Sequence, residues 1–319
     1  MEFLQQLEGQ HPKSVMSIAI SPDGKTFASC SPGKLIDYGV INIWTFYQGE
    51  FDLVTNSHIL SEKSYALPGN STVDFSSDGQ SITYGSSNND VKVYSLESRT
   101  VTKTFSGHSS NSWRGVCFDP TSPRVVSSNR DGTIRVWSLK NKPFSFITGS
   151  QLLSIPTQDY GVNTIRVDTN GKILAGACSD RSIRIWDLNT GELLRTLTGY
   201  SANVRALTIF PEQELIASVT VDDTVRIWDF VTGETVSVLS EHSNGIISVA
   251  VSPDSKILAV GDSDKKVTLW NLHTGEVGVI RGFPDYVFSL AITTNVITSS
   301  RILLVGCGGG TIVAWKLSF

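Results

Sequence analysis

A phrase of eight or nine residues recurs along this chain of 319 residues, and no other feature constrains its fold as strongly. In each copy, a turn is followed by a short alternating run that ends near an aromatic residue. The copies read YGVINIWTF (38–46), NDVKVYSL (89–96), DGTIRVWSL (131–139), DRSIRIWDL (180–188), DDTVRIWDF (222–230), DKKVTLWNL (264–272) and GGTIVAWKL (309–317). Their aromatic anchors lie 50, 43, 49, 42, 42 and 45 residues apart. A period of this length indicates repeated structural units that bury a core only by stacking.

Each unit reads as a set of short strands. Within one phrase, Ile183 and Ile185 fall on one face, and Arg184 and Trp186 fall on the other, which is the period of a strand. Asp-Gly and Asn-Gly pairs punctuate the units, and these pairs favour the tight turns of hairpins. No long segment has the period of a helix. Three or four short strands per unit predict an all-β propeller fold.

The phrases resemble the repeats of the WD40 family over essentially the whole chain. A blade of that family opens with Gly-His and ends its third strand with Trp-Asp. Gly107–His108 matches the opening, and Trp186–Asp187 and Trp228–Asp229 match the ending, whereas Trp137–Ser138 and Trp270–Asn271 depart from it. The resemblance implies a seven-bladed β-propeller made of four-stranded antiparallel blades.

The two ends of the chain are predicted to close the ring. The last blade reaches only its third strand, at 311–317, before the sequence stops. Residues 3–7 look like the missing fourth strand, because LQQLEGQH is similar to LRTLTGY at 194–200. Pairing these segments would remove an open sheet edge. We therefore expect residues 1–319 to form a single propeller domain.

The polar residues that recur in the blades are interpreted as structural. His108, either Ser127 or Ser128, and Asp131 are the residue types of a hydrolase triad. The resemblance implies instead a buried hydrogen-bonded network inside each blade. The Asp position also recurs from blade to blade, whereas a catalytic residue is usually needed once. The residues assigned to these networks are His108, Asp131, Trp137, Asp180, Trp186, Asp222, Trp228, His242, Asp264 and Trp270.

Motifs for catalysis and metal binding are absent from the sequence. No H-x-x-x-H or H-E-x-x-H pair is present, and no G-x-S-x-G elbow. We therefore predict no catalytic residue, no cofactor and no metal site. The four cysteines form no C-x-x-C pair and lie in or beside apolar runs, so they are predicted to be buried, reduced thiols.

Charge and hydropathy indicate the class of partner and the compartment. The net charge is −4 and no run of five Lys or Arg residues occurs, which argues against a nucleic-acid partner. The sequence contains no stretch of eighteen apolar residues, so no membrane-spanning helix is predicted. Its N-terminus also lacks the pattern of a secretory signal. We expect a cytoplasmic protein that is monomeric by itself.

The resemblance also implies where a partner binds. In such propellers, the loops before each first strand and the turns between the second and third strands form one face, here called the top face. The residues on either side of the first apolar position in each first strand lie near the central opening of this face. The top face of blades six, seven and one is predicted to carry an apolar patch of Met16, Leu35, Ile36, Tyr38, Ile247, Phe283, Tyr286 and Phe288.

Blades three and five are predicted to add Arg114, Arg130 and Arg205 on the same face. Aromatic and arginine side chains are the usual anchors of interfaces. The alternative is that several of these side chains pack between blades and stay dry.

The predicted function is a non-catalytic scaffold that binds a peptide or protein on the top face. One alternative is a propeller enzyme or ligand-binding protein that uses the central channel, since a fold never excludes chemistry. Another is recognition of phosphopeptides or RNA by the arginine-bearing half, which would give binding that weakens steeply with salt.

Overall fold

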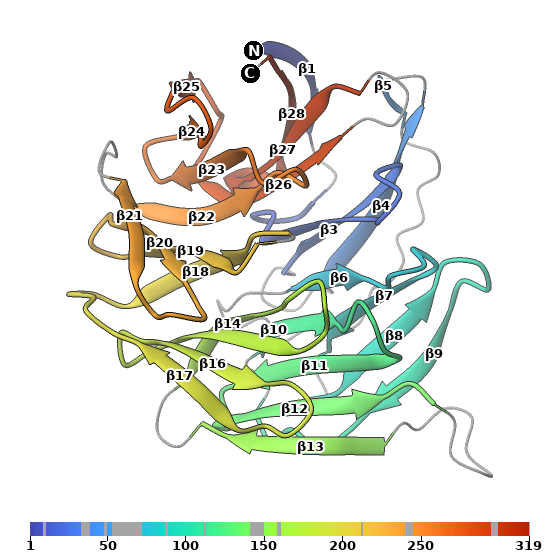
Figure 1. The fold of residues 1–319 in the computed structure, drawn as a ribbon. Coiled ribbons are helices and arrows are strands. Elements are labelled where there is room, and N and C mark those ends of the chain that lie inside the picture. The colour runs from blue at the N-terminus through green and yellow to red at the C-terminus, as the bar shows by residue number, and fades with distance from the viewer. Residues whose placement is uncertain are drawn as a thin grey trace.

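The computed structural model describes residues 1–8, 11–32, 39–47, 50–52, 72–86, 89–110, 113–140, 150–157, 161–211, 213–239, 245–294 and 299–318. Within these ranges the chain forms 28 β-strands and one 3₁₀ turn, Gly308–Gly310. The strands form seven four-stranded sheets, which confirms the predicted all-β propeller (Figure 1).

Six blades take their four strands in chain order and pair them antiparallel. Blade one contains β2 (Ser17–Ile20), β3 (Thr26–Ser31), β4 (Val40–Tyr47) and β5 (Glu50–Asp52), and blade two contains β6 (Val73–Phe75), β7 (Ser81–Gly85), β8 (Val91–Ser95) and β9 (Thr100–Phe105). Blade three contains β10 (Trp113–Phe118), β11 (Arg124–Asn129), β12 (Thr133–Ser138) and β13 (Ser150–Pro156), and blade four contains β14 (Val162–Val167), β15 (Ile173–Cys178), β16 (Ile183–Asp187) and β17 (Leu193–Leu197). Blade five contains β18 (Val204–Ile209), β19 (Leu215–Thr220), β20 (Val225–Asp229) and β21 (Thr235–Leu239), and blade six contains β22 (Ile246–Val251), β23 (Ile257–Asp262), β24 (Lys266–Asn271) and β25 (Val277–Arg281).

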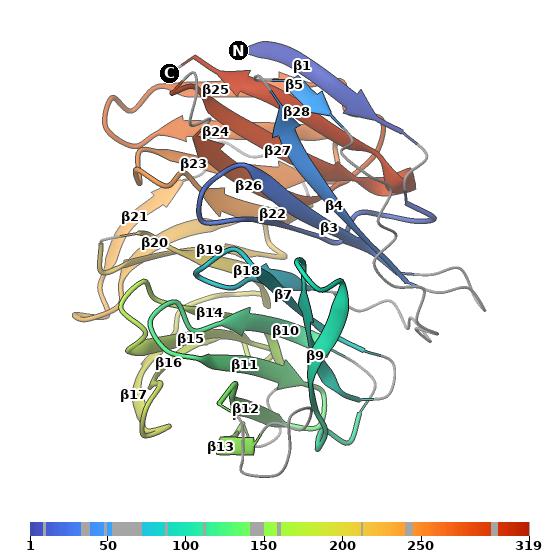
Figure 2. The ribbon, with the colours of Figure 1, turned by 90° about the vertical axis from the view of Figure 1, so that its right-hand side faces the viewer.

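Blade seven combines the two ends of the chain. It contains β26 (Val287–Thr294), β27 (Arg301–Cys307) and β28 (Ile312–Leu317), and its outer strand is β1 (Glu2–Leu7). Strand β1 pairs antiparallel with β28, with Phe3 opposite Trp315 and Leu7 opposite Ile312. Both views of the ribbon show β1 beside β28 (Figures 1 and 2). The predicted closure by the N-terminal strand is confirmed.

The hydrophobic core lies in layers between neighbouring blades. Between blades five and six, for example, Val219 and Ile227 pack with Ile246, Leu258 and Trp270, all at most 5% exposed. The repeated tryptophan belongs to these layers, since Trp44, Trp137, Trp186, Trp228 and Trp270 are 1–5% exposed. A buried aromatic ring of this size contributes more apolar area than any other side chain, which explains why the repeat retains one.

Hydrogen bonds near the centre of the ring tie consecutive first strands together. The Ser248 hydroxyl of blade six donates to the Val287 carbonyl of blade seven at 3.1 Å. The Ser289 hydroxyl of blade seven donates to the Val15 carbonyl of blade one at 2.8 Å. These contacts connect the blades across the point where the chain ends meet and hold the top-face loops of blades six, seven and one in register.

All four cysteines are buried and free, as the sequence predicts. Burial raises the pKa of the Cys30 and Cys307 thiols to about 12. Thiols with such pKa values stay protonated and unreactive near neutral pH.

Candidate interaction surface

A buried hydrogen-bonded relay locks blade three. Trp137 Nε1 donates to Ser127 Oγ at 2.8 Å, and Ser127 Oγ lies 2.8 Å from His108 Nε2. The other ring nitrogen of His108, Nδ1, lies 2.7 Å from the Asp131 carboxylate. Burial lowers the pKa of His108, so the neutral imidazole donates from Nδ1 to Asp131 and accepts at Nε2 from Ser127. Every polar group of the relay is then paired.

This relay holds the three residue types of a hydrolase triad but cannot act as one. Ser127 is 0% exposed and His108 is 5% exposed. A nucleophile must reach its substrate, whereas this hydroxyl is enclosed and already bonds the tryptophan. The side chains of this set therefore hold the blade together.

Blade one repeats part of the relay. Trp44 Nε1 donates to Ser29 Oγ at 2.7 Å, and His11 Nε2 lies 2.7 Å from the same hydroxyl. The histidine, serine and tryptophan of the two blades thus occupy equivalent places. A buried serine between two ring nitrogens satisfies both of them.

Blade five uses a tyrosine in place of the histidine. The Tyr200 hydroxyl lies 2.6 Å from Ser218 Oγ and accepts a hydrogen bond from Trp228 Nε1. The guanidinium of Arg226 lies 5.1 Å from the centroid of the Tyr200 ring, within the range of a cation–π contact. Tyr200 therefore fills the position of the histidine, but it bonds the serine through a hydroxyl and not through a ring nitrogen.

In blade seven the same position is apolar. Phe283 is 4% exposed, and its ring centroid lies 6.5 Å from that of Trp315 at an interplanar angle of 66°. Phe283 therefore packs inside the blade and does not belong to the exposed apolar patch. This outcome follows the alternative in which a predicted anchor packs between blades.

The turn aspartates of blades four and five bond within their own blades. Asp180 accepts from Ser182 and pairs with Arg184 at 2.6 Å. Asp222 accepts from the hydroxyls of Thr220 and Thr224. These contacts close the turns between the second and third strands, and they involve no histidine.

Blade six adds a buried carboxylate that the sequence analysis did not single out. Asp262 is 2% exposed, accepts from the backbone N–H groups of Asp264 and Lys266, and lies 3.7 Å from the Lys266 ammonium. In the sequence, only the position of Asp262 two residues before the repeated Asp could have indicated this role. His242 of the same blade lies outside the described residues.

The first apolar position of each first strand is a buried anchor. Val15, Val162, Val204, Ile246 and Val287 are 0–1% exposed. In blades three to seven the register shifts after this position, so the next residue is the unpaired residue of a β-bulge. A bulge bends the strand and redirects one side chain. Four of the predicted partner-binding residues occupy these bulges, namely Arg114, Arg205, Ile247 and Phe288.

Tyr286 is the most exposed of the described apolar candidates. It is 46% exposed and directly precedes the anchor Val287. Its ring centroid lies 6.3 Å from that of Phe288, which is partly buried. The Tyr286 carbonyl accepts from Gly308, and its N–H donates to the Asp285 carboxylate. The Tyr286–Phe288 pair is therefore held by a backbone in which both the N–H and the C=O of Tyr286 are hydrogen-bonded.

A glycine turn makes this corner of the ring tight. Gly310 has a φ of 83°, and a Cβ placed there would lie 2.2 Å from the His11 carbonyl oxygen. The loop before blade one therefore presses directly against the second turn of blade seven. Only glycine combines that backbone angle with such a close approach.

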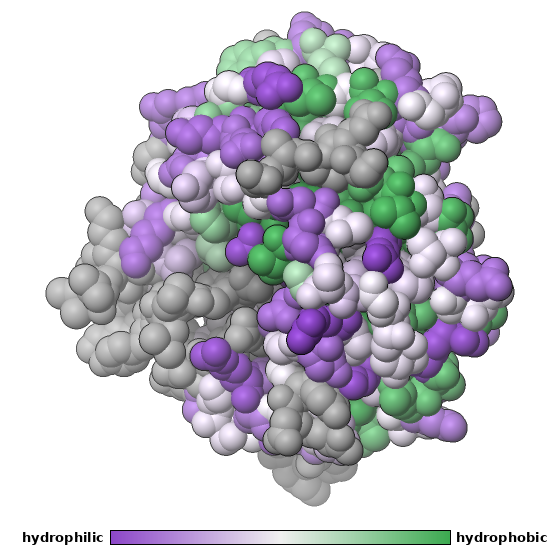
Figure 3. Space-filling model, turned by 90° about the vertical axis from the view of Figure 1, so that its left-hand side faces the viewer, coloured by the Kyte–Doolittle hydropathy of each residue, from purple (hydrophilic) through white to green (hydrophobic). Residues whose placement is uncertain are grey.

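Met16 and Ile247 are partly buried on the blades that flank Tyr286. Leu35, Ile36 and Tyr38 lie outside the described residues. Figure 3 shows the molecule from the side at which β22 begins, and hydrophobic residues there form small groups among polar ones. Below, the name blade 6–7–1 patch denotes Met16, Ile247, Tyr286 and Phe288.

Arg130 and Arg205 stand apart from each other in the ring. Arg130 is exposed after β11 of blade three, and blade four separates it from Arg205 of blade five. Arg205 Nη1 donates to the Ile246 carbonyl at 3.0 Å, so this guanidinium helps to join blades five and six. The side chain of Arg114 lies outside the described part of the structure.

The described residues contain no group of three His, Cys, Asp or Glu side chains that could hold a metal ion. Among the same residues, no helix has the length and apolar character needed to cross a membrane.

Comparison with known families agrees with the geometry. A model described as the WDR36/Utp21 second beta-propeller domain matches residues 36–279, and a model described as WD domain, G-beta repeat matches residues 1–45. The chain belongs to the WD40-repeat family. Membership of this family supports a general role in protein–protein interaction.

The relatives of this WD40 chain are longer proteins. It is 29% identical over 66% of its length to the nuclear distribution protein PAC1 of Komagataella phaffii, covering 41% of that protein. It is 29% identical over 50% of its length to periodic tryptophan protein 2 of Arabidopsis thaliana, covering 17% of it. It is 27% identical over 49% of its length to autophagy-related protein 16 of Arabidopsis thaliana, covering 29% of it. The chain thus spans less than half of each of these relatives.

Proposed function

We propose that this propeller is a non-catalytic interaction platform that binds a peptide or protein partner on the blade 6–7–1 patch. The observation that carries the proposal is the half-exposed Tyr286 ring beside Phe288, on a loop fixed by backbone hydrogen bonds. Rigid aromatic side chains bury a large area at a small cost in conformational entropy, which makes them effective anchors.

The surroundings of the tyrosine also suit a docking site. Met16 and Ile247 lie on the adjacent blades and are partly buried, so they offer apolar surface without exposing a large patch. The Lys265 ammonium of blade six donates to the Pro284 carbonyl at 3.0 Å and steadies the loop that leads to Tyr286. A preformed surface of this kind orders few groups on binding and so retains more affinity.

The proposal treats residues 1–319 as one propeller domain that acts as a monomer in the cytoplasm, without a cofactor. Nucleic acid is not the expected partner, because the net charge is −4. The chain is similar to a nuclear distribution protein and to an autophagy-related protein.

A comparative pull-down tests the proposal. Wild-type protein and the Tyr286→Ala variant are each used to capture proteins from native lysate, and the captured proteins are quantified by mass spectrometry. Val221→Ala is the matched control, because Val221 is a 53% exposed apolar residue in the top-face turn of blade five. We expect one captured protein to be lost with Tyr286→Ala and retained with Val221→Ala. Equal recovery by all three proteins would refute the proposed site.

A further inference from the structure

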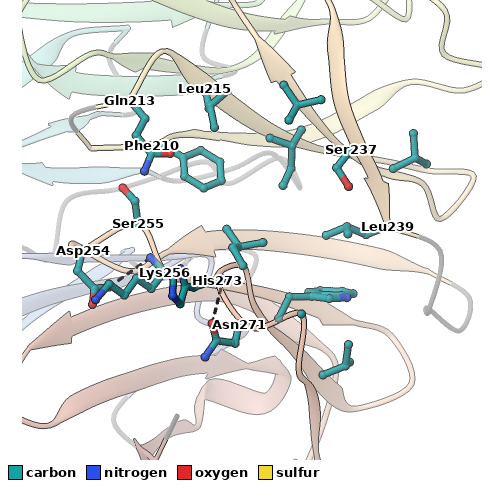
Figure 4. Close-up of a pocket in the computed structure, with 17 residues that line it drawn as sticks. Phe210, Gln213, Leu215, Ser237, Leu239, Asp254, Ser255, Lys256, Asn271 and His273 are labelled. Atoms are coloured by element: carbon teal, nitrogen blue, oxygen red, sulfur yellow. Dashed lines mark hydrogen bonds between the residues drawn. The ribbon is translucent and has the colours of Figure 1, made fainter.

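A cleft of about 710 Å³ lies between blades five and six, away from the top face. It is lined by β21, by the turns between the first and second strands, and by the turn between β24 and β25. These turns lie at the opposite ends of the strands from the top-face loops. In Figure 4, Phe210 and Leu215 lie on one side of the cleft, and Lys256, Asn271 and His273 lie on the other.

The cleft is apolar inside. Phe210, Ile227 and Trp270 line it and are 1–5% exposed, so they form its floor. Leu239 of blade five and Leu272 of blade six also line it, and both are partly buried against the core layer between these blades. Apolar walls contributed by two blades suit apolar side chains from a ligand.

The floor depends on a departure from the repeat at Phe210. The turn between the first and second strands begins at the residue whose N–H donates to the carbonyl five residues later. In the other described turns that residue is Ser21, Ser76, Asp119, Asp168 or Ser252, and its side chain hydrogen-bonds within the turn. Phe210 occupies the same position in blade five, with its N–H bonded to the Leu215 carbonyl. A capping oxygen is thus replaced by a ring that lines the cleft.

The outer wall is a strand with an open edge. In the sheet of blade five, β21 pairs only with β20 and lies at the end of the order. Alternate N–H and C=O groups of such a strand point outward without a partner strand. Ser237 and Leu239 of this strand lie opposite Ile227 and Val225, so their partly buried side chains face the cleft, whereas Val238 lies opposite Arg226 on the other face of the sheet and is 51% exposed. An extended peptide satisfies both features at once, through its backbone and its alternate side chains.

The mouth of the cleft favours an acidic ligand. Asp254 is neutralised by Arg301, whose guanidinium lies 2.5 Å from its carboxylate. Lys256 is exposed beside them and takes part in no ion pair among the described residues. A carboxylate from a ligand would therefore meet a positive charge here.

The two walls are held together before any ligand binds. Ser255 has a φ of 57°, at a turn position where Gly24 and Gly79 stand in blades one and two. Its hydroxyl donates to the Pro211 carbonyl of blade five at 2.8 Å. A glycine there would relieve the backbone strain but lose this bond between the blades. The serine thus fixes the separation of the walls.

We propose that the cleft between blades five and six binds an extended apolar segment of a protein partner, which adds to β21 as a fifth strand and places an acidic residue near Lys256. This site is separate from the blade 6–7–1 patch, since it lies at the opposite ends of the strands and shares only blade six with it.

A display experiment with a defined probe tests the proposal. Random linear decapeptides are selected on the full-length chain, and enriched peptides are synthesised and titrated by fluorescence anisotropy. We expect alternating apolar residues with an acidic residue at one end. Ser237→Lys is expected to weaken binding about ten-fold or more, because it places a charge on the wall of the cleft beside Ile227. Val238→Lys, at the neighbouring position on the opposite face of the same strand, is the matched control and should leave binding unchanged.

Hydrogen exchange tests the mode of binding. Adding a strand to β21 protects amides within residues 235–239, and Tyr286→Ala should leave this protection intact. Peptides that bind Ser237→Lys as tightly as wild type, or that leave these amides unprotected, would overturn the proposal. Failure of selection to enrich any peptide would overturn it too. A dimer in sedimentation that Ser237→Lys converts to monomer would assign the cleft to a second copy of this chain instead.

Discussion

Blades three and seven enclose their third-strand tryptophan in opposite ways, one through hydrogen bonds and the other through ring packing. In blade three, Trp137 is bonded to Ser127, and the serine is bonded to His108, which is bonded to Asp131. All four polar groups are buried or nearly so, and all have partners.

Blade seven has apolar residues or glycine at the positions equivalent to that relay. The strand register places Val305 where blade three has Ser127, and Gly309 where it has Asp131. Phe283 stands in place of His108 and its ring centroid lies 6.5 Å from that of Trp315, while the ring of Phe3 in β1 lies 5.6 Å from the same tryptophan. Trp315 Nε1 is buried without a hydrogen-bond partner among the described residues.

In these two blades the histidine and the serine are kept or replaced together. A buried histidine without its serine, or a serine without its histidine, leaves an unpaired polar group that costs about 1–3 kcal/mol. Complete relays and complete apolar sets both avoid most of this cost, whereas mixtures do not. Among its described residues, blade seven therefore has no hydrogen-bonded relay at the place where strand β1 packs against it.

The largest effect is expected from removing residues 1–8. This deletion strips β28 of its partner strand and Trp315 of the Phe3 ring, so the ring opens at blade seven. We expect the melting temperature to fall by about 10 °C or more, as a loss of several kcal/mol implies for a domain of this size. Phe3→Ala, which keeps the strand, serves as the control and should cause a smaller fall. An unchanged melting temperature after the deletion would show that the closure contributes little.

Ser127→Ala should destabilise the protein by about 2–4 kcal/mol, since it leaves Trp137 Nε1 and His108 Nε2 buried without their shared partner. The measurement is urea unfolding followed by tryptophan fluorescence. A loss below about 0.5 kcal/mol would mean that the relay is not needed for blade three.

Phe283→His should cost about 1–3 kcal/mol, because it puts an imidazole beside Val305 with no hydroxyl to bond it. Adding Val305→Ser should recover part of this loss, by about 1 kcal/mol of coupling. The single variants and the double variant complete a thermodynamic cycle. Losses that simply add would contradict the view that these positions act as a set.

A pH dependence should distinguish blade three as well. Burial lowers the pKa of His108 below its ordinary value of 6.5, although Asp131 opposes this shift. Protonation is therefore harder in the folded state, so stability is lost as the pH falls below 6.5 and is fully present above it.

Asp131 acts in the same direction at lower pH. Although burial raises its pKa, hydrogen bonds from Thr133, Ser109 and His108 outweigh this and hold it below 3.8, so its contribution is lost on stronger acidification.

We expect His108→Phe to lose less stability than wild type between about pH 8 and pH 5, measured by urea unfolding at each pH. Asp74, whose pKa burial raises to about 6, titrates in both proteins and cancels in the comparison. Identical pH profiles for the two proteins would show that His108 does not titrate differently on folding.

Much of the fold could be predicted from local pattern. The alternating phrases predicted the third strands, and the similarity of residues 3–7 to a fourth strand predicted the pairing of β1 with β28, far apart in sequence. This prediction succeeded because the blades with a weak repeat pattern could be interpreted by comparison with the blades in which the pattern is clear. The partner-binding surface was harder, since Phe283 and Tyr286 look alike in sequence but are 4% and 46% exposed.

The sequence by itself determined the blades, their number and their closure, because period-two alternation and turn residues act within a few positions of the chain. Only the tertiary structure decided which aromatic faces solvent and where two blades leave an apolar cleft. Phe210 was visible as a departure from the repeated turn, but its meaning depends on Trp270 and Leu272 of the next blade. Exposure is set by neighbours that come from other repeats, and no local pattern records them.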